Sequence, residues 1–387
     1  MEFGYKIKNE WLLDDEVTFL NHGSFGATPL KVLQAKEEIE RRLEREPLSF
    51  FADEFPVLLK ESISRLAKFV NANEENLVLV ENATTGINTI LRSLEKELKP
   101  GDEIITPNHV YPGIRNTMKF IAERTGAKAI EFDIPFPVID NDKIVEIITQ
   151  QINSKTKIII LDHIASPTAL IFPIEGIIRI CKSKGIITII DGAHAPGMLE
   201  LNLESLGADF YTGNCHKWMF TPKGCALLWV SKEWQNRINP LAISLFHGNG
   251  FQEEFAWTGT KNPSPWFSLS PAIDFYNSLG FEKLREYNHK LICDATDLIC
   301  RELNVTEHAK YDMLGFMSSI ELPIKITIDE KTTMELRNHF MKEYRIELPF
   351  HTLNNKVFFR ISAQVYNEID DYKRLVSALK DFISKIK

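Results

Sequence analysis

Between residues 77 and 230, short apolar runs alternate with longer segments of helical periodicity. The runs are NLVLV, DEIITP, KAIEFDI, TKIIILDHI, GIITIIDG, ADFYTGN and CALLWV. TTGINTILRSLEKEL and IEGIIRICKSKG, which follow two of these runs, have the spacing of amphipathic helices. Near-continuous β-branched strands separated by helices are typical of a mainly parallel sheet covered on both faces. We therefore predict a doubly wound α/β domain, in which ligands bind at the carboxyl ends of the strands.

After about residue 265 the pattern changes to long helical segments with only two apolar runs, FMSSIELPI and KVFFRIS. The last twenty residues, EIDDYKRLVSALKDFISKIK, read as an amphipathic helix. A chain of 387 residues exceeds one small domain, so a second domain is expected. We predict an N-terminal segment (1–18) that packs with the small domain, a large domain (19–264) and a small α+β domain (265–387).

Composition excludes several classes of protein. The net charge of −8 and the scattered basic residues do not fit a nucleic-acid-binding protein. Five cysteines without a CxxC pair fit neither a disulfide framework nor a zinc site, and we predict no bound metal. The first residues lack the apolar core of a signal peptide, and no apolar run approaches the ~20 residues that span a bilayer. We expect a cytoplasmic protein without membrane or nucleic-acid partners.

Polar residues follow several of the predicted strands. Ala83, Thr84 and Thr85 open a helix after NLVLV, where free N–H groups and hydroxyls suit a phosphate. A plain threonine N-cap would give the same pattern. Tyr111 precedes a Pro-Gly turn after DEIITP, where its ring could face a ligand or simply lie on the surface.

Asp191 and Lys217 follow two further predicted strands and are separated by 217 − 191 = 26 residues, about one crossover unit. A carboxylate after a buried strand needs a partner, so Asp191 is either a turn or N-cap residue or the counter-charge of a cationic ligand atom. His194 lies three residues beyond it. Lysine is rarely buried without a partner, so Lys217 in TGNCHKWMFTPKG either reaches water or takes part in chemistry.

Together these features match one cofactor, pyridoxal 5'-phosphate (PLP). PLP needs a lysine for a Schiff base, an acid at its pyridine nitrogen, a phosphate site and an aromatic face. The GxxxxGK[ST] and GxGxxG motifs of nucleotide-binding proteins do not occur in the chain.

The chain resembles the class V aminotransferase family of fold-type I PLP enzymes, and within it the isopenicillin N epimerase-like branch. The stretches that carry the resemblance span nearly the whole chain: FLNHGSFGATP at 19–29, ENATTGIN at 81–88, ASPTALIFPI at 165–174, DGAHAPG at 191–197, YTGNCHKWMFTPKG at 211–224, WTGTKNPSPW at 257–266 and FRISAQVYN at 359–367. The resemblance implies a homodimer with a shared active site, in which Thr260 reaches the partner's phosphate.

The same resemblance implies a role for each matching residue. Lys217 would form the Schiff base and move the Cα proton, with Asp191 at the pyridinium nitrogen and Tyr111 on the ring. The phosphate would be held by Ala83, Thr84, Thr85, Asn214 and His216. Ser166 and His194 would lie near the phenolic oxygen.

Arg360 is the expected clamp for the substrate's α-carboxylate, because a guanidinium matches a carboxylate bidentately. A structural ion pair with Asp370 or Asp371 is the alternative from the residues alone. Asn21, His22 and Gly23 are expected to line the substrate pocket beside Arg360.

The reaction stays open at this point between an epimerase and a C–S lyase acting on a cysteine conjugate or sulfoxide. Both begin with loss of the Cα proton, but an epimerase needs a second proton donor opposite Lys217, for which Tyr111 or a histidine would serve. A sulfur-relay desulfurase is not expected, because residues 344–360 contain no cysteine. Cys215 and Cys225 are expected to be packing residues. A transaminase and a non-catalytic binding relative are the remaining alternatives.

Overall fold

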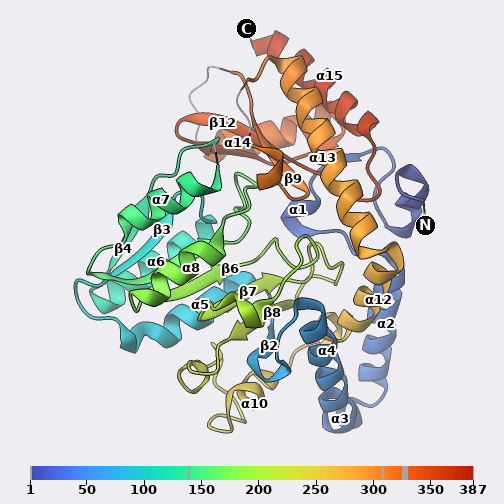
Figure 1. Ribbon diagram of the computed structural model, residues 1–387. Coiled ribbons are helices and arrows are strands. Elements are labelled where there is room, and N and C mark those ends of the chain that lie inside the picture. The colour runs from blue at the N-terminus through green and yellow to red at the C-terminus, as the bar shows by residue number, and fades with distance from the viewer. Residues whose placement is uncertain (1, 138–139, 307–308, 325–329, 387) are drawn as a thin grey trace.

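A seven-stranded sheet forms the centre of the larger part of the molecule (Figure 1). The computed structural model describes residues 2–137, 140–306, 309–324 and 330–386. The strand order is β2-β8-β7-β6-β5-β3-β4. The strands are β2 (Leu77–Val80), β3 (Glu103–Pro107), β4 (Lys128–Phe132), β5 (Thr156–Asp162), β6 (Ile187–Asp191), β7 (Phe210–Asn214) and β8 (Ala226–Val230).

The sheet is mainly parallel, as the sequence predicts. Only β8 runs against its neighbours, pairing antiparallel with β7 on one side and β2 on the other. The connection from β7 to β8 covers only residues 215–225 and contains no helix. A connection of this kind joins antiparallel strands, whereas parallel neighbours need a longer crossover. Nothing in the apolar run CALLWV indicates that this strand runs antiparallel to its neighbours.

Both faces of the sheet are covered, because alternate side chains of each strand enter different cores. Ile158 and Ile160 belong to the core under one set of helices, whereas Ile159 and Leu161 belong to the core on the other face. The first face is covered by α5 (Ala83–Ser93), α6 (Pro112–Thr125) and α10 (Phe251–Ala256). The second is covered by α2 (Leu30–Arg45), α4 (Phe55–Val70), α7 (Asn141–Gln151), α8 (Ile174–Ser183) and α12 (Leu269–Leu279).

Shorter elements complete this part of the chain. They are η1 (Tyr5–Glu10), β1 (Thr18–Phe19), α1 (His22–Phe25), α3 (Pro47–Ser49), the π-helix η2 (Phe50–Glu54), η3 (Glu74–Asn76), η4 (Leu94–Glu97), α9 (Leu203–Leu206), η5 (Gln235–Arg237) and α11 (Ser264–Phe267).

The C-terminal part contains a smaller antiparallel sheet in the order β11-β12-β9, with β9 (Met317–Glu321), β11 (Phe350–Leu353) and β12 (Lys356–Ser362). Figure 1 shows the long helix α13 (Phe281–Leu303) rising from α12 to lie beside α15 (Ile369–Ile386). The remaining elements are η6 (Tyr311–Met313), α14 (Glu330–His339), the π-helix η7 (Phe340–Tyr344) and β10 (Ile346–Glu347). This matches the expected α+β character of the region.

The two ends of the chain are joined by backbone contacts. β1 pairs in parallel with β10, and the N–H of Gly4 donates to the carbonyl of Val365 at 2.7 Å. Trp11 lies between the two parts, since its ring contacts Phe220 and Tyr366. The boundaries at 18/19 and 264/265 stay a prediction. In the described part of the chain, no helix combines the length and the apolar character needed to cross a membrane.

Candidate active site

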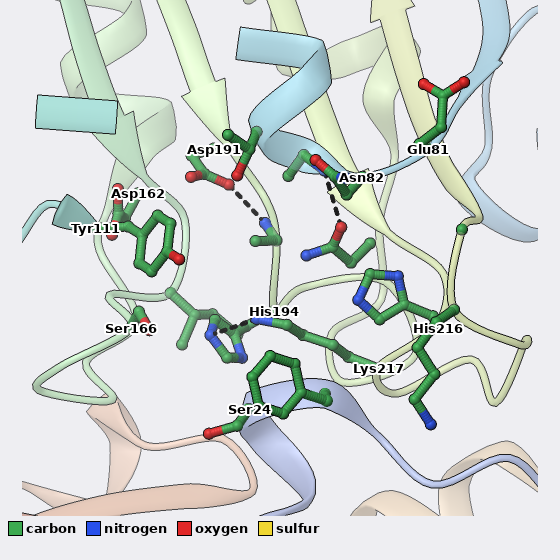
Figure 2. Close-up of a pocket in the computed structure, with 18 of the residues that line it drawn as sticks. Ser24, Glu81, Asn82, Tyr111, Asp162, Ser166, Asp191, His194, His216 and Lys217 are labelled. Atoms are coloured by element: carbon green, nitrogen blue, oxygen red, sulfur yellow. Dashed lines mark hydrogen bonds between the residues drawn. The ribbon is translucent and has the colours of Figure 1, made fainter. Parts of the chain in front are cut away.

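A cavity of about 360 Å³ opens at the carboxyl ends of the large sheet (Figure 2). Residues predicted from the sequence that line it are Ala83, Thr84, Tyr111, Ser166, Asp191, His194, Asn214, His216, Lys217 and Arg360. Residues that the sequence analysis did not single out are Ser24, Phe25, Glu81, Asn82, Asp162, Ile164, Ala193, Lys223 and Gly224.

Asp191 ends β6 and is buried, with 4% of its surface exposed. Its Oδ1 accepts a hydrogen bond from the N–H of Ala193 at 2.9 Å. Burial raises the pKa of Asp191, while the Ala193 N–H and the nearby Lys217 ammonium lower it. The N–H and the ammonium favour a negative charge on Asp191, although burial has the larger effect on its pKa, and Asp191 lines the cavity.

Lys217 lies on the loop between β7 and β8, and its amine is buried. The Nζ atom is 3.1 Å from Nε2 of His194. Burial, and then the positive charge of Arg360, lower the pKa of Lys217 to about 7, against the opposing effects of Asp191 and Asp162. An amine with such a pKa is about half neutral at pH 7, so it can act as a nucleophile and as a base.

Several contacts hold the backbone of the Lys217 loop. The ring of His22 bonds to the carbonyl of Lys217 through Nε2 at 3.0 Å and to the hydroxyl of Tyr366 through Nδ1 at 2.7 Å. Burial lowers the pKa of His22 to about 3, so this ring is neutral. Phe220 has a left-handed φ of 66° and is fully buried, which shows that packing outweighs the backbone strain at this position.

The structure therefore places His22 behind the loop rather than in the cavity wall. Its neighbours Ser24 and Phe25 line the cavity instead. Asn21 donates to Glu347 at 3.3 Å, and the N–H of Gly23 donates to Ser362 at 3.1 Å. A role for Asn21, His22 and Gly23 in the substrate pocket stays a prediction, whereas the contacts of His22 indicate that it positions the lysine.

The N-terminus of α5 forms the anion-binding end of the cavity. Asn82 is the N-cap, and its side chain accepts from both the N–H and the hydroxyl of Thr85. The N–H and the hydroxyl of Thr85 are therefore both bonded to the N-cap residue. The side-chain oxygen of Asn214 accepts from the N–H of Ala83 at 2.9 Å, which leaves its NH₂ as the group able to donate into the cavity. Thr84 and His216 line the cavity beside them, and the positive end of the helix favours an anion here.

Arg360 enters the cavity from β12 and is buried. Its guanidinium donates to the carbonyl and hydroxyl of Ser166 and to the hydroxyl of Ser24 at 3.1 Å, while its buried Nε has no partner in the described structure. Burial lowers its pKa only to about 10, so it remains charged at neutral pH. The alternative ion pairs do not form, since Asp370 bonds to Lys373, and Asp371 accepts from Tyr5 and Asn367.

Tyr111 and His109 have different environments. Tyr111 precedes α6, lines the cavity and is 45% exposed. His109 is buried outside the cavity wall, with its ring nitrogens bonded to the Thr168 hydroxyl at 2.9 Å and the Ile134 carbonyl at 3.0 Å. Of these two residues, only Tyr111 could meet a ligand.

These groups fit PLP, the cofactor expected from the sequence. Three buried polar atoms at the cavity have no partner in the described structure: Oδ1 of Asp162, Nδ1 of His194 and Nε of Arg360. An amine, an acid and a helix N-terminus line one cavity, and these are the groups that would form a Schiff base, pair with a pyridinium nitrogen and hold a phosphate. Thr260 lies in a different, largely apolar pocket with Trp257, so its contact with a partner's phosphate stays a prediction, as does the homodimer.

The five cysteines are free thiols, four of them buried and Cys293 only partly buried. Cys215 and Cys225 are fully buried at the base of the Lys217 loop, where the N–H of Cys215 donates to the carbonyl of Cys225 at 3.1 Å. A hydrogen bond with the Cys225 thiol, together with burial, raises the pKa of Cys215 well above its usual value. Neither thiol lines the cavity in the described structure.

Comparison with known proteins agrees with this fold and with PLP as the cofactor. The aminotransferase class-V family model matches residues 27–319. A probable chloroplastic L-cysteine desulfhydrase of Arabidopsis thaliana is 26% identical over 96% of this chain and 84% of its own length. The hercynylcysteine sulfoxide lyase of Schizosaccharomyces pombe is 28% identical (99% and 98%), and the isopenicillin N epimerase of Amycolatopsis lactamdurans is 28% identical (95% and 96%).

A solved structure shares the fold. The apo cysteine desulfurase of Thermococcus onnurineus superimposes with a TM-score of 0.82 at 20% identity, covering 100% of this chain and 99% of that protein. This likeness supports the architecture of a large α/β part with a smaller C-terminal sheet.

Proposed function

This chain belongs to the class V aminotransferase family of PLP enzymes, and we propose that it is a C–S lyase acting on an L-cysteine derivative. The reaction converts R–S–CH₂–CH(NH₃⁺)–COO⁻ and water into R–SH, pyruvate and ammonium, with an S-oxide releasing a sulfenic acid instead. Bound PLP supplies the electron sink that accepts the pair left when the Cα proton is removed. The remaining chemistry falls to side chains of the cavity.

Lys217 is the proton carrier in this proposal. Its pKa of about 7 allows the neutral amine to take the Cα proton and the resulting ammonium to give a proton to the leaving sulfur. A single mobile amine therefore completes the elimination. The neutral ring of His194, 3.1 Å away, can accept a hydrogen bond from the amine, because burial and the Lys217 charge lower the histidine pKa well below its usual value.

An epimerase would need a second proton donor on the opposite side of the substrate. Among the described residues that line the cavity, His194 already contacts Lys217, and His216 lies at the anion-binding end with its Nδ1 near the carbonyl of Cys225. Tyr111 is the remaining candidate, and its place in the cavity wall is the observation that keeps epimerisation as a second candidate. No other histidine lines the cavity in the described part of the chain, and this favours elimination.

Arg360 would orient the substrate. Ser24 and Ser166 hold the guanidinium in one position, so it can meet the α-carboxylate without first losing side-chain freedom. Burial strengthens this charge pair, since water does not screen it. The two curated relatives named for C–S cleavage, a desulfhydrase and a sulfoxide lyase, also support the proposal.

The test is NMR in D₂O of the PLP-loaded protein with L-cysteine, S-alkyl-L-cysteines and their S-oxides. Pyruvate together with a released thiol or sulfenic acid is the expected result. Deuterium at Cα with loss of optical purity, and no keto acid, would overturn the lyase in favour of the epimerase. Two variants serve as controls: Lys217→Ala should stop either reaction, and Tyr111→Phe should stop racemisation in an epimerase while elimination in a lyase continues.

A further inference from the structure

A second carboxyl group lies beside Asp191. Asp162 ends β5, and the two residues are direct partners in the parallel register of β5 and β6. Side chains at partnered positions of neighbouring strands point to the same face of the sheet. Both line the cavity, with 6% of Asp162 and 4% of Asp191 exposed, and Figure 2 shows them at the same edge.

The two carboxyl groups are supported unequally. Each carboxyl group meets one backbone N–H, that of Ala193 for Asp191 and that of Ser166 for Asp162. The Oδ1 atom of Asp162, however, is buried without a partner in the described structure. Two neighbouring carboxylates in a site with little water cannot both be ionised at low cost. We therefore expect Asp191 to carry the negative charge and Asp162 to carry the proton.

We propose that Asp162 is a positioning residue that holds the proton of this carboxyl pair, so that Asp191 alone carries the negative charge facing the cofactor's ring nitrogen. The inference rests on the proposed function for the place of the cofactor, but the protonation of Asp162 is a property of the protein alone. A neutral Asp162 keeps one negative charge, rather than two, next to the ring. It also places a hydrogen-bond donor in the cavity wall.

The charged and titratable surroundings of Asp162 agree with this assignment. Burial, and then the charge of Asp191, raise the pKa of Asp162 well above its usual value. The backbone N–H of Ser166, Lys217 on the β7–β8 loop and Arg115 on α6 act against this rise of the pKa. Tyr111 at the start of α6 lines the same cavity. For Asp191 the pKa is raised by burial but lowered by the Ala193 N–H and Lys217.

The first test is infrared difference spectroscopy of the PLP-free protein near neutral pH. Wild type minus Asp162→Asn should show the carbonyl stretch of a protonated carboxylic acid, which a merely structural role would not produce. Loss of carboxylate bands instead would overturn the proposal. The matched control is Asp209→Asn. Asp209 accepts hydrogen bonds from Thr188 and Trp234 and precedes β7, at the opposite end of the strands from the cavity, so its replacement should leave the Asp162 carbonyl stretch in place.

A second measurement uses stability and does not need the lyase reaction. A raised folded pKa means that the native state holds an extra proton, so stability falls as pH rises from the unfolded value through the folded value. The melting temperature of PLP-free Asp162→Asn, relative to wild type, should therefore increase between about pH 5 and pH 9. A difference that stays constant over this range would refute the proposal.

If Asp162→Asn does not fold, wild-type protein carrying ¹³C-labelled aspartate carboxyls provides the same answer. One buried aspartate should keep the chemical shift of the protonated acid at neutral pH, and full ionisation of all of them would refute the proposal. Failure of the lyase assay alone would leave these results unchanged, so the two proposals fail separately.

Discussion

The amine of Lys217 should be unusually reactive in the PLP-free protein. With a pKa of about 7, roughly three-quarters of it is neutral at about pH 7.5, compared with about 0.1% of an ordinary lysine. The neutral fraction is thus several hundred times larger. Because the side chain is buried, the absolute labelling rate is reduced, and the pH midpoint of labelling is the quantity to compare.

Competitive reductive methylation with formaldehyde over a range of pH, followed by peptide mass spectrometry, measures this midpoint. The exposed Lys119 in the same digest is the internal reference. Replacing Arg360 by Gln should raise the Lys217 midpoint, because the arginine charge lowers the pKa of the amine. Arg285→Gln, on the outer part of α13, is the matched control and should have no effect. A Lys217 midpoint equal to that of Lys119 would refute the reasoning.

Three further predictions follow from contacts in the cavity. Arg360→Ala should raise KM for substrates with a free α-carboxylate by an amount equivalent to about 2–5 kcal/mol. Steady-state kinetics checks this, and an unchanged KM would leave the arginine a structural role only. Asp191→Asn should still bind PLP but slow the exchange of the Cα proton, and wild-type exchange in D₂O would contradict its role at the ring nitrogen. Gly26→Ala should lower both the melting temperature and the PLP occupancy, because the φ of Gly26 is +67° and a Cβ there would lie 2.1 Å from the His216 carbonyl oxygen. A variant that matches wild type in both measurements would show that the Lys217 loop can move to make room for the Cβ.

The sequence predicted most reliably those cavity residues that lie at the ends of predicted strands. Asp191 and Asn214 end buried strands, and Lys217 comes three residues after one, so their presence at the carboxyl ends of a mainly parallel sheet follows from the strand pattern. Asp162 carries the same signal as Asp191, a carboxylate after an apolar run, and could have been found by the same reasoning.

Other features depend on contacts that no local pattern reveals. Arg360 bonds to Ser24 and Ser166, which are 336 and 194 residues away in the chain. The nearby acids Asp370 and Asp371 were the partners that sequence proximity suggested. Likewise, the motif at 19–29 indicated a pocket segment but not which of its side chains faces the cavity, because that depends on how α1 packs against β12 and the Lys217 loop.

Arg360 lies far beyond Lys217 in the sequence, and this order has a consequence during protein synthesis. The strands, helix start and loop that surround the lysine amine have all left the ribosome when β12 has yet to be translated. Until β12 returns to Ser24, the amine lacks the positive neighbour that helps to lower its pKa. The lysine therefore reaches its fully lowered pKa only after β12 has been made and has packed beside Ser24.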